Sequence, residues 1–312
     1  MKFKKAMSVA SLVFASTVVL AACGGNEDKK DSSSESSAAS SEVAKDSSSK
    51  EETKEMKQVA GGELKDGTYK LVEKDYDDKG WKVEFAMTVK DGKITESDYN
   101  YINEKGDKKS DDKEYQKAME AKTKTGPAMF IPELNEALVA SQNAADVEVV
   151  SGATHSSEAF RNYAQQLVQA AQAGNQETIE IANTADLQDG TYSLATKNAS
   201  NGWTETFEMT VEGGKITKSN YDGTNDKGEI KSENKEYQEM MKKTAGVGPA
   251  DFFPTLNEAL VEKQDAGAVE VVSGATHSSE AFKLWAAQLI NAAQKGDTAK
   301  IEVDNIVMEE VK

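Results

Sequence analysis

The chain has 312 residues and carries 54 acidic residues against 37 Lys and Arg residues, for a formal net charge of −17 at pH 7. Such a surface excludes nucleic-acid binding through phosphate contacts, and it offers no basic patch for an anionic membrane. Plain solubility explains the charge, and a field that attracts a cationic or metal-bearing partner is the alternative. The single cysteine, Cys23, excludes an intrachain disulfide framework.

The first 22 residues have the pattern of a secretory signal. Lysines at positions 2, 4 and 5 precede an apolar run over residues 6–20, which is too short for a transmembrane helix. The run ends in Leu-Ala-Ala-Cys, which resembles a bacterial lipobox, in which Cys23 is acylated and becomes the new N-terminus. An ordinary secretory signal with a chance cysteine is the alternative. We therefore predict a signal peptide over residues 1–22 and a lipid anchor that holds the chain at the extracellular face of the cell membrane.

Residues 23–60 are predicted to form a disordered tether after the lipidated cysteine. They contain few large apolar residues and no aromatic ones, so they cannot bury enough surface to offset the entropy of ordering. A flexible chain of this length has a mean reach of about 35 Å. The folded part would therefore sample space above the membrane or within a cell wall.

The rest of the chain repeats itself. The segment Val147–Phe160 returns letter for letter as Val269–Phe282, and shorter matches at the same offset accompany it on both sides. A period of about 120 residues indicates a duplicated domain rather than a solenoid repeat. We therefore predict two homologous domains, over residues 61–182 and 183–312. The segment that joins them is short, which predicts adjacent domains with restricted motion.

In chain order, the first copy predicts strands followed by helices. Period-two patterns and turn or breaker residues define the elements, with a hairpin turn at Asp91-Gly92 that Gly213-Gly214 replaces in the second copy. The predicted strands are Gly67–Glu73, Trp81–Lys90, Ile94–Ile102, Val147–Val150 and Thr178–Ile181, and the predicted helices are Lys113–Lys122, Pro132–Ser141 and Ser156–Ala173. Each copy is thus predicted to be an α+β domain, an antiparallel sheet with packed helices.

The repeated segment contains the sequence Ser-Gly-Ala-Thr-His-Ser-Ser-Glu, between a short predicted strand and the start of a helix. Gly152 permits a tight turn, and the hydroxyls at positions 151, 154, 156 and 157 are capable of capping free N–H groups. A helix start also attracts phosphate. A plain N-cap is the simpler interpretation, but a cap needs one hydroxyl and here a whole segment is kept. The only two histidines of the chain, His155 and His277, directly follow the two threonines; two histidines so far apart do not indicate a metal site.

Common enzyme signatures are missing from the sequence. The segment lacks the Gly-x-Ser-x-Gly nucleophile elbow, and the chain has neither a Gly-rich dinucleotide fingerprint nor a P-loop.

At these residues the sequence resembles the FMN-binding domain family, known from the NqrC and RnfG subunits of respiratory electron-transfer complexes. In that family the last threonine of Ser-Gly-Ala-Thr carries FMN through a phosphoester, attached by a flavin transferase of the ApbE type. The resemblance implies two covalent FMN cofactors, on Thr154 and Thr276. Ser151, Gly152, Ala153, Ser273, Gly274 and Ala275 would shape the two turns. The family often has Asp three residues before the serine, where this chain has Glu148 and Glu270.

Two such domains on a lipoprotein resemble the PplA-type lipoproteins of flavin-based extracellular electron transfer in Gram-positive bacteria. The resemblance implies an electron carrier rather than an enzyme. A membrane NADH dehydrogenase and quinone pool would supply electrons, and ferric iron or free flavins would accept them. Two alternatives stay open: a non-redox lipoprotein that binds a ligand or partner, and a role for the signal peptide as a released pheromone.

The residues that contact the flavin ring are less well defined by the sequence. The repeated segments Gly126–Phe130 and Gly248–Phe252 would either pack on the ring or form core loops. Trp81 and Trp203 are expected in the core rather than against the flavin.

Overall fold

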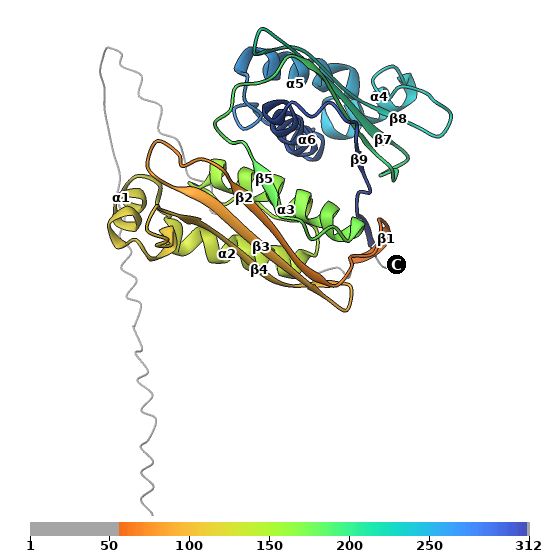
Figure 1. The fold of residues 1–312 in the computed structure, drawn as a ribbon. Coiled ribbons are helices and arrows are strands. Elements are labelled where there is room, and N and C mark those ends of the chain that lie inside the picture. The colour runs from red at the N-terminus through yellow and green to blue at the C-terminus, as the bar shows by residue number, and fades with distance from the viewer. Residues whose placement is uncertain (1–55, 311–312) are drawn as a thin grey trace, which may run out of the picture. The chain divides into compact units, whose positions relative to one another are not determined.

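Each repeat forms a four-stranded sheet (Figure 1). The structure is a computed structural model that describes residues 56–310. The predicted signal peptide, Cys23 and most of the predicted tether lie outside these residues. In the first sheet, of order β4-β3-β2-β5, the strands are β2 (Gly67–Glu73), β3 (Lys82–Lys90), β4 (Lys93–Ile102) and β5 (Ile179–Ile181). In the second, of order β8-β7-β6-β9, they are β6 (Gly190–Thr196), β7 (Thr204–Glu212), β8 (Lys215–Thr224) and β9 (Ile301–Val303).

The strands form where period-two patterns place apolar side chains on one face. Along β3, Val83, Phe85, Met87 and Val89 are buried and the residues between them are less so. The hairpin turn at Asp91-Gly92 has φ angles of 52° and 71°, the left-handed pair that a two-residue hairpin requires. The three long strands of each sheet are antiparallel, and the short last strand lies parallel to the first. The predicted α+β domains are confirmed.

In the described chain, each repeat has three helices, of which the second and third pack on its sheet and the first packs on the second. In the first repeat they are α1 (Lys113–Thr123), α2 (Pro127–Ser141) and α3 (Thr154–Ala173), with short 3₁₀ turns η1 (Lys109–Asp111) and η2 (Ala144–Asp146). In the second they are α4 (Lys235–Ala245), α5 (Pro249–Lys263) and α6 (Thr276–Lys295). An aromatic cluster forms the centre of the first core: the ring centroids of Phe85 and Phe160 are 5.1 Å apart, and those of Tyr99 and Phe160 are also 5.1 Å apart.

Two elements differ from the sequence prediction. Helix α2 begins at Pro127 rather than near Pro132, because Pro127 occupies the first helical position, where proline needs no N–H partner. Pro132 is tolerated inside the helix, since the carbonyl that it leaves free belongs to the exposed Ala128 and is open to water. Residues Val147–Val150 form no strand, because the hydroxyl of Ser157, and not a neighbouring strand, accepts the N–H of Val150.

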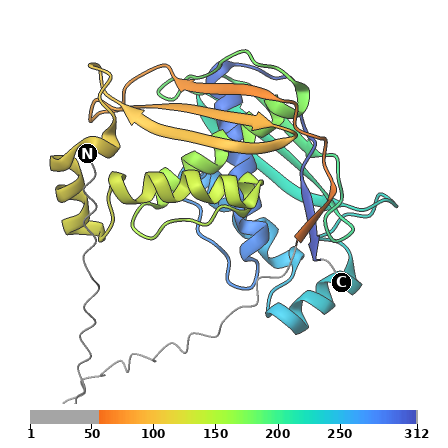
Figure 2. The same ribbon diagram turned by 90° about the horizontal axis from the view of Figure 1, so that it is seen from below.

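The two ends of the described chain pair with each other. Strand β1 (Met56–Ala60) runs antiparallel to β10 (Val307–Glu310), and the two lie side by side in Figures 1 and 2. The last five residues of the predicted tether are therefore a strand. Its partner comes from the far end of the sequence, which a local composition argument does not reveal.

The two repeats contact each other through α3 and α6, within the compact unit that ends at Lys312. Glu158 pairs with Lys283, and Arg161 pairs with Glu280. These pairs are reciprocal, because Glu158 is the counterpart of Glu280 and Arg161 is the counterpart of Lys283. All four residues lie in the first two turns or so of their helices, and hydrogen bonds such as Gln169–Gln288 extend the contact into the second halves of α3 and α6. Within residues 56–310, no helix has the length and apolar character needed to cross a membrane.

Candidate functional site

A tight turn leads into α3, and it requires glycine at its second position. Gly152 has φ +81°, and a Cβ built there would lie 2.5 Å from the carbonyl oxygen of Thr123. Gly274 has the same φ in the second repeat and approaches the carbonyl of Ala245 in the same way. Both the backbone conformation and the close approach exclude a larger residue. The turns around residues 152 and 274 thus have equivalent shapes, as the letter-for-letter repeat predicts.

A buried serine fixes each turn to its helix. The N–H of Val150 donates to Ser157 Oγ at 3.0 Å, and this hydroxyl donates to the carbonyl of Ala153 at 3.0 Å. Ser279 makes the equivalent bonds with Val272 and Ala275, at 3.0 and 2.9 Å. The alternative of a plain side-chain N-cap does not hold in either repeat, because the N-cap residues are Ala153 and Ala275, which have no hydroxyl. Ser157 instead tethers the loop, and the two alanines pack into the cores.

The threonines of the motif occupy the first position of α3 and of α6. Thr154 and Thr276 are exposed, as are Ser151 and Ser273 in the preceding turns. Neither threonine hydroxyl has a hydrogen-bond partner among residues 56–310, nor does the N–H of either threonine. A helix start without a side-chain cap leaves N–H donors free and carries a partial positive charge. Each threonine hydroxyl therefore stands where a phosphate group would find donors.

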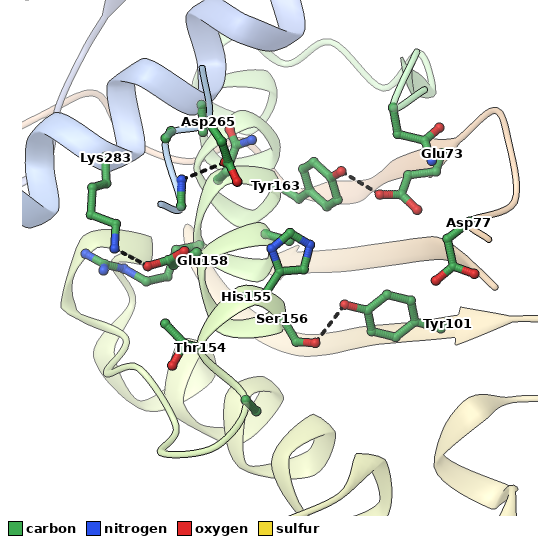
Figure 3. Close-up of a pocket in the computed structure, with 18 of the residues that line it drawn as sticks. Glu73, Asp77, Tyr101, Thr154, His155, Ser156, Glu158, Tyr163, Asp265 and Lys283 are labelled. Atoms are coloured by element: carbon green, nitrogen blue, oxygen red, sulfur yellow. Dashed lines mark hydrogen bonds and ion pairs between the residues drawn. The ribbon is translucent and has the colours of Figure 1, made fainter. Parts of the chain in front are cut away.

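A cavity of about 610 Å³ lies beside Thr154 (Figure 3). This volume is in the range of sites that take a small molecule or cofactor. The first turn of α3 forms one wall with Thr154, His155 and Ser156, and β2, β4 and η1 contribute residues of the first repeat. The second repeat contributes Asp265 and Lys283 to the same cavity. The cavity thus connects the predicted attachment residue with the contact between the repeats.

Two hydrogen-bonded chains line this cavity (Figure 3). The hydroxyl of Tyr101 donates to Ser156 Oγ at 3.0 Å and accepts from the hydroxyl of Tyr99 at 2.8 Å. The hydroxyl of Tyr163 donates to Glu73 Oε1 at 2.6 Å. These bonds fix the phenol rings against the first turn of α3 and the end of β2. They give the cavity rigid walls of mixed polar and aromatic character.

Burial shifts the pKa values of the groups in these walls. Desolvation raises the pKa of Glu73, although the hydrogen bonds from Tyr163 and from the N–H of Val83 oppose the shift. Desolvation raises the pKa of Tyr101 to about 12, so its phenol stays protonated at neutral pH. Desolvation also lowers the pKa of Lys109 to about 8. Burial therefore destabilises the charged forms of both Glu73 and Lys109 in this site.

The second repeat builds the same site with exchanged parts. Thr196 stands at the position of Glu73, and the carboxylate comes instead from Glu205 on the neighbouring strand β7. Glu205 accepts from Trp285 Nε1 at 2.7 Å, where Tyr163 is the donor in the first repeat. Gly223 replaces Tyr101. A carboxylate bonded to an aromatic donor of α3 or α6 is thus common to both sites.

Sequence reasoning did not single out Glu73, Glu205, Lys109 or Lys231. The carboxylates were hidden because they change strand between the repeats. The two lysines had a weak signal: Lys109-Ser110 returns as Lys231-Ser232, but the nearby residues Lys113–Gln116 return as well, as Lys235–Gln238. No group of three or more His, Cys, Asp or Glu residues that could hold a metal ion occurs in the described part of the chain.

The segments Gly126–Phe130 and Gly248–Phe252, considered above as contacts of the flavin ring, contain both buried and exposed residues. Phe130 is buried and lines the cavity, whereas Met129 is 48% exposed and does not line it. Trp81 and Trp203 are each 6% exposed, and Trp81 belongs to the core of the first repeat, as predicted. Trp81 packs edge-on against Tyr115.

Comparisons with known proteins agree with the duplication. The model of the FMN-binding domain matches residues 79–169 and again residues 202–291. Over 118 residues the chain is 37% identical to the 15 kDa lipoprotein of Treponema pallidum, a match that covers 38% of this chain and 84% of that protein.

Among solved structures, a Clostridium perfringens protein is 38% identical, with a TM-score of 0.37, and the match covers 38% of this chain and 98% of that one. A Clostridium thermocellum protein is 26% identical with a TM-score of 0.24, over 35% of this chain and 92% of that one. The family model covers more than half of the chain, in two copies that each contain one Ser-Gly-Ala-Thr turn. The chain therefore belongs to the FMN-binding domain family.

Proposed function

We propose that this protein is a lipid-anchored electron carrier that bears two covalent FMN cofactors, one on Thr154 and one on Thr276. The observation that carries the proposal is the state of these two hydroxyls. Each is exposed at the first position of a 20-residue helix, without a hydrogen-bond partner among the described residues. Neither threonine hydroxyl caps its helix, and Ser157 and Ser279 instead bind the preceding loops through the N–H groups of Val150 and Val272.

The residues around each threonine suit a phosphoester. The hydroxyl would lose its proton and form a bond to the phosphorus of FMN, while the bond from that phosphorus to the leaving group of the transferase's flavin substrate would break. The free N–H groups of the helix start would face the remaining phosphate oxygens. Gly152 and Gly274 allow the turn to present the hydroxyl, and the cavity beside Thr154 offers room for the rest of the cofactor. When bound, FMN would supply the electron-transfer chemistry, and the protein would position the ring and adjust its electrostatic surroundings.

The place of the carrier follows from the sequence and from its relative. We propose acylation at Cys23 and a location on the extracellular face of the cell membrane, in line with the lipoprotein that is 37% identical. An ApbE-type transferase would attach the flavins. A membrane NADH dehydrogenase and quinone pool would supply the electrons, and ferric iron or free flavins would accept them. A covalent bond suits a compartment in which a dissociated flavin would be lost by diffusion.

The direct test is intact-protein mass spectrometry of the lipoprotein purified from its native host, followed by peptide mapping. We expect an added mass of two FMN units, each less one water, on the peptides that contain Thr154 and Thr276. Thr154→Ala and Thr276→Ala should each remove one unit, whereas Thr178→Ala, a matched control at an exposed threonine outside the motif, should retain both. An unmodified wild-type chain from cells that make the transferase would overturn the proposal and favour a non-redox binding lipoprotein.

A further inference from the structure

A buried lysine stands in the wall of the cavity without a polar partner. Lys109 is 6% exposed, and its ammonium group forms no hydrogen bond or ion pair within residues 56–310. Its Nζ lies 4.3 Å from the ring centroid of Tyr101, 4.3 Å from that of Tyr115 and 5.6 Å from that of Trp81. The three rings offset part of the cost of burying the charge, but none of them is an anion.

The second repeat keeps this arrangement. Lys231 lies 5.3 Å from the ring centroid of Tyr237 and 6.0 Å from those of Trp203 and Phe253. Phe253 replaces Tyr101 as the third ring, so three aromatic side chains surround the ammonium group in both repeats. The lysine and its three-ring surroundings are kept in both domains although the third ring comes from a different residue, which indicates a common use.

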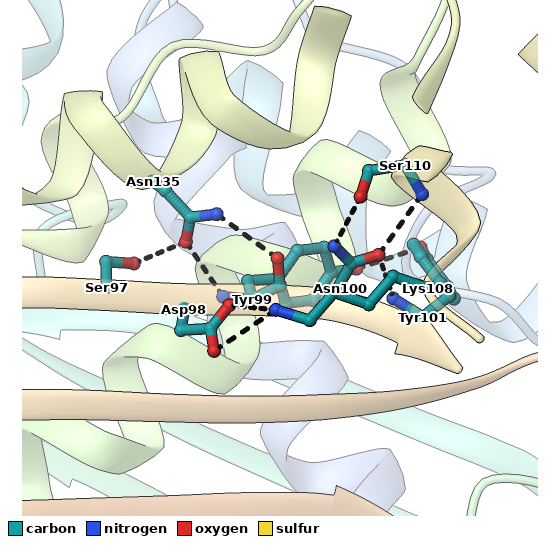
Figure 4. Close-up of polar contacts among 8 residues, drawn as sticks. All are labelled: Ser97, Asp98, Tyr99, Asn100, Tyr101, Lys108, Ser110 and Asn135. Atoms are coloured by element: carbon teal, nitrogen blue, oxygen red, sulfur yellow. Dashed lines mark hydrogen bonds and ion pairs between the residues drawn. The ribbon is translucent and has the colours of Figure 1, made fainter. Parts of the chain in front are cut away.

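The residues on either side of Lys109 are held in place (Figure 4), and Lys109 itself lines the cavity. Lys108 pairs with Asp98 at 3.0 Å on the outside of β4, and Asn100 Nδ2 donates to Ser110 Oγ at 2.8 Å. Asn135 of α2 holds β4 itself, since its side chain accepts the N–H of Tyr99 at 2.9 Å. Lys109 lies between two anchored neighbours, and its position therefore does not depend on a flexible loop.

The charges that face Lys109 leave its ammonium group weakly compensated. Burial lowers its pKa, Asp77 and Glu73 raise the pKa, and Lys79 lowers it further. These three groups come from β2 and the β2–β3 loop, whereas α1 and β4 contribute only aromatic rings and η1 the lysine itself. An additional negative charge in the cavity would complete the compensation.

We propose that Lys109, and Lys231 in the second repeat, contact the bound flavin and stabilise the negative charge that its ring gains on reduction. The inference rests on the proposed attachment of FMN. Reduction of the ring by two electrons takes up one proton and leaves one negative charge on the ring, which the ammonium group would face. The phosphate is a less suitable counter-ion, because free N–H groups of the helix start already surround it at Thr154. Lys109 lines the cavity against the ring of Tyr101, whose hydroxyl contacts Ser156 in the first turn of α3.

The test compares flavin midpoint potentials in a chain loaded only at Thr154, made with Thr276→Ala. Lys109→Met removes the inward charge at similar volume, and Lys108→Met removes the neighbouring outward charge as a matched control. We expect Lys109→Met to decrease the equilibrium constant for reduction at least tenfold, which lowers the midpoint of a two-electron couple by about 30 mV. Lys108→Met should leave the midpoint near that of the parent.

The pH dependence gives a second readout. Because a negative ring raises the pKa of Lys109, reduction above pH about 8 should draw an extra proton onto the lysine, and the midpoint should fall more steeply with pH there. Lys109→Met should lack this extra slope. Equal midpoints and slopes in the two variants overturn the inference, and a loss of flavin loading without a change in midpoint assigns the lysine to the phosphate and also overturns it.

Two controls keep the result interpretable. If Lys109→Met fails to fold, the same pair of measurements is made at Lys231, in a chain loaded only at Thr276 through Thr154→Ala. Lys109→Arg should restore the midpoint by restoring the charge. Mass spectrometry of each sample shows whether flavin is attached, so a chain that lacks flavin contradicts the proposed function, and a loaded chain with unshifted midpoints contradicts the lysine inference alone.

Discussion

The ion pair between Glu158 and Lys283 offers a quantitative test of how the two repeats are held together. The two side chains are 14% and 10% exposed, so neither charge is well hydrated. Lys283→Met leaves the carboxylate of Glu158 buried without its partner, a change that costs about 3–5 kcal/mol in comparable pairs. For a folded unit of this size, a loss of about 3 kcal/mol lowers the melting temperature by roughly 6–12 °C.

The matched control is an exposed pair of the same chemistry. Lys197 and Glu302 are 3.5 Å apart, with side chains 52% and 57% exposed. Lys197→Met should cost at most about 1 kcal/mol. The assay is urea unfolding followed by circular dichroism, with thermal melts in parallel. A Lys283→Met variant as stable as Lys197→Met would refute the contact between α3 and α6.

The double variant Glu158→Met/Lys283→Met separates the cost of a lone charge from the value of the pair. Burial raises the pKa of Glu158 although Lys283 opposes the shift, which means that the ionised carboxylate is itself under strain. Replacing both charges with apolar side chains should therefore return the stability to within about 1 kcal/mol of the wild type. A double variant as unstable as Lys283→Met would contradict this account.

Three further changes test the site by unfolding measurements. Gly152→Ala should lower the free energy of unfolding by about 3 kcal/mol, because it combines a positive φ with a Cβ 2.5 Å from the carbonyl oxygen of Thr123. Gly80→Ala, at φ +80° with open space around the new Cβ, should lower it by about 1 kcal/mol. Equal losses would mean that the close approach at Gly152 does not exist. Ser157→Ala should cost about 1–3 kcal/mol, since it leaves a buried N–H unsatisfied, and a neutral result would contradict the loop tether. The pKa of Glu73 is raised in the folded state, so the stability of the fold should decline as the pH rises above 4.5 and through that raised pKa. Glu73→Gln should remove this decline.

Local patterns predicted most of the elements of each domain. Strand β2 has the predicted bounds Gly67–Glu73, and α3 begins two residues before the predicted start at Ser156. These elements follow from side-chain periodicity and from glycine in turns, which are properties of neighbouring residues. The strand predicted at Val147–Val150 failed because an apolar run was not enough without a partner strand. Strand β1 was missed for the opposite reason, since its partner β10 lies at the other end of the chain.

The candidate site was predicted in part. The motif identified Thr154, Thr276 and the turns around them, because the repeat made a short segment conspicuous. Ser157 was one of four hydroxyls considered capable of capping, and its actual role depends on the path of the preceding loop, which no local pattern encodes. The reciprocal pairing of α3 with α6 could not be predicted either, because a charged residue on a helix gives no sign of which surface it will meet.

The carboxylate beside α3 and α6 is a structural feature that the two repeats share although their aligned sequences differ at its position. Glu73 lies across from Val83 and accepts its N–H at 2.8 Å; in the second repeat the acid has moved to Glu205, at the position of Val83, and Thr196 Oγ1 accepts the N–H of Glu205 at 2.7 Å. The acid and its neighbour have thus exchanged strands while the bond to an aromatic donor persists. A carboxylate without a role would not be expected to keep its bond to an aromatic donor after moving to another strand. We infer that a carboxylate is required at this point of both domains, and that alignment of the repeats by sequence alone scores both of its positions as mismatches.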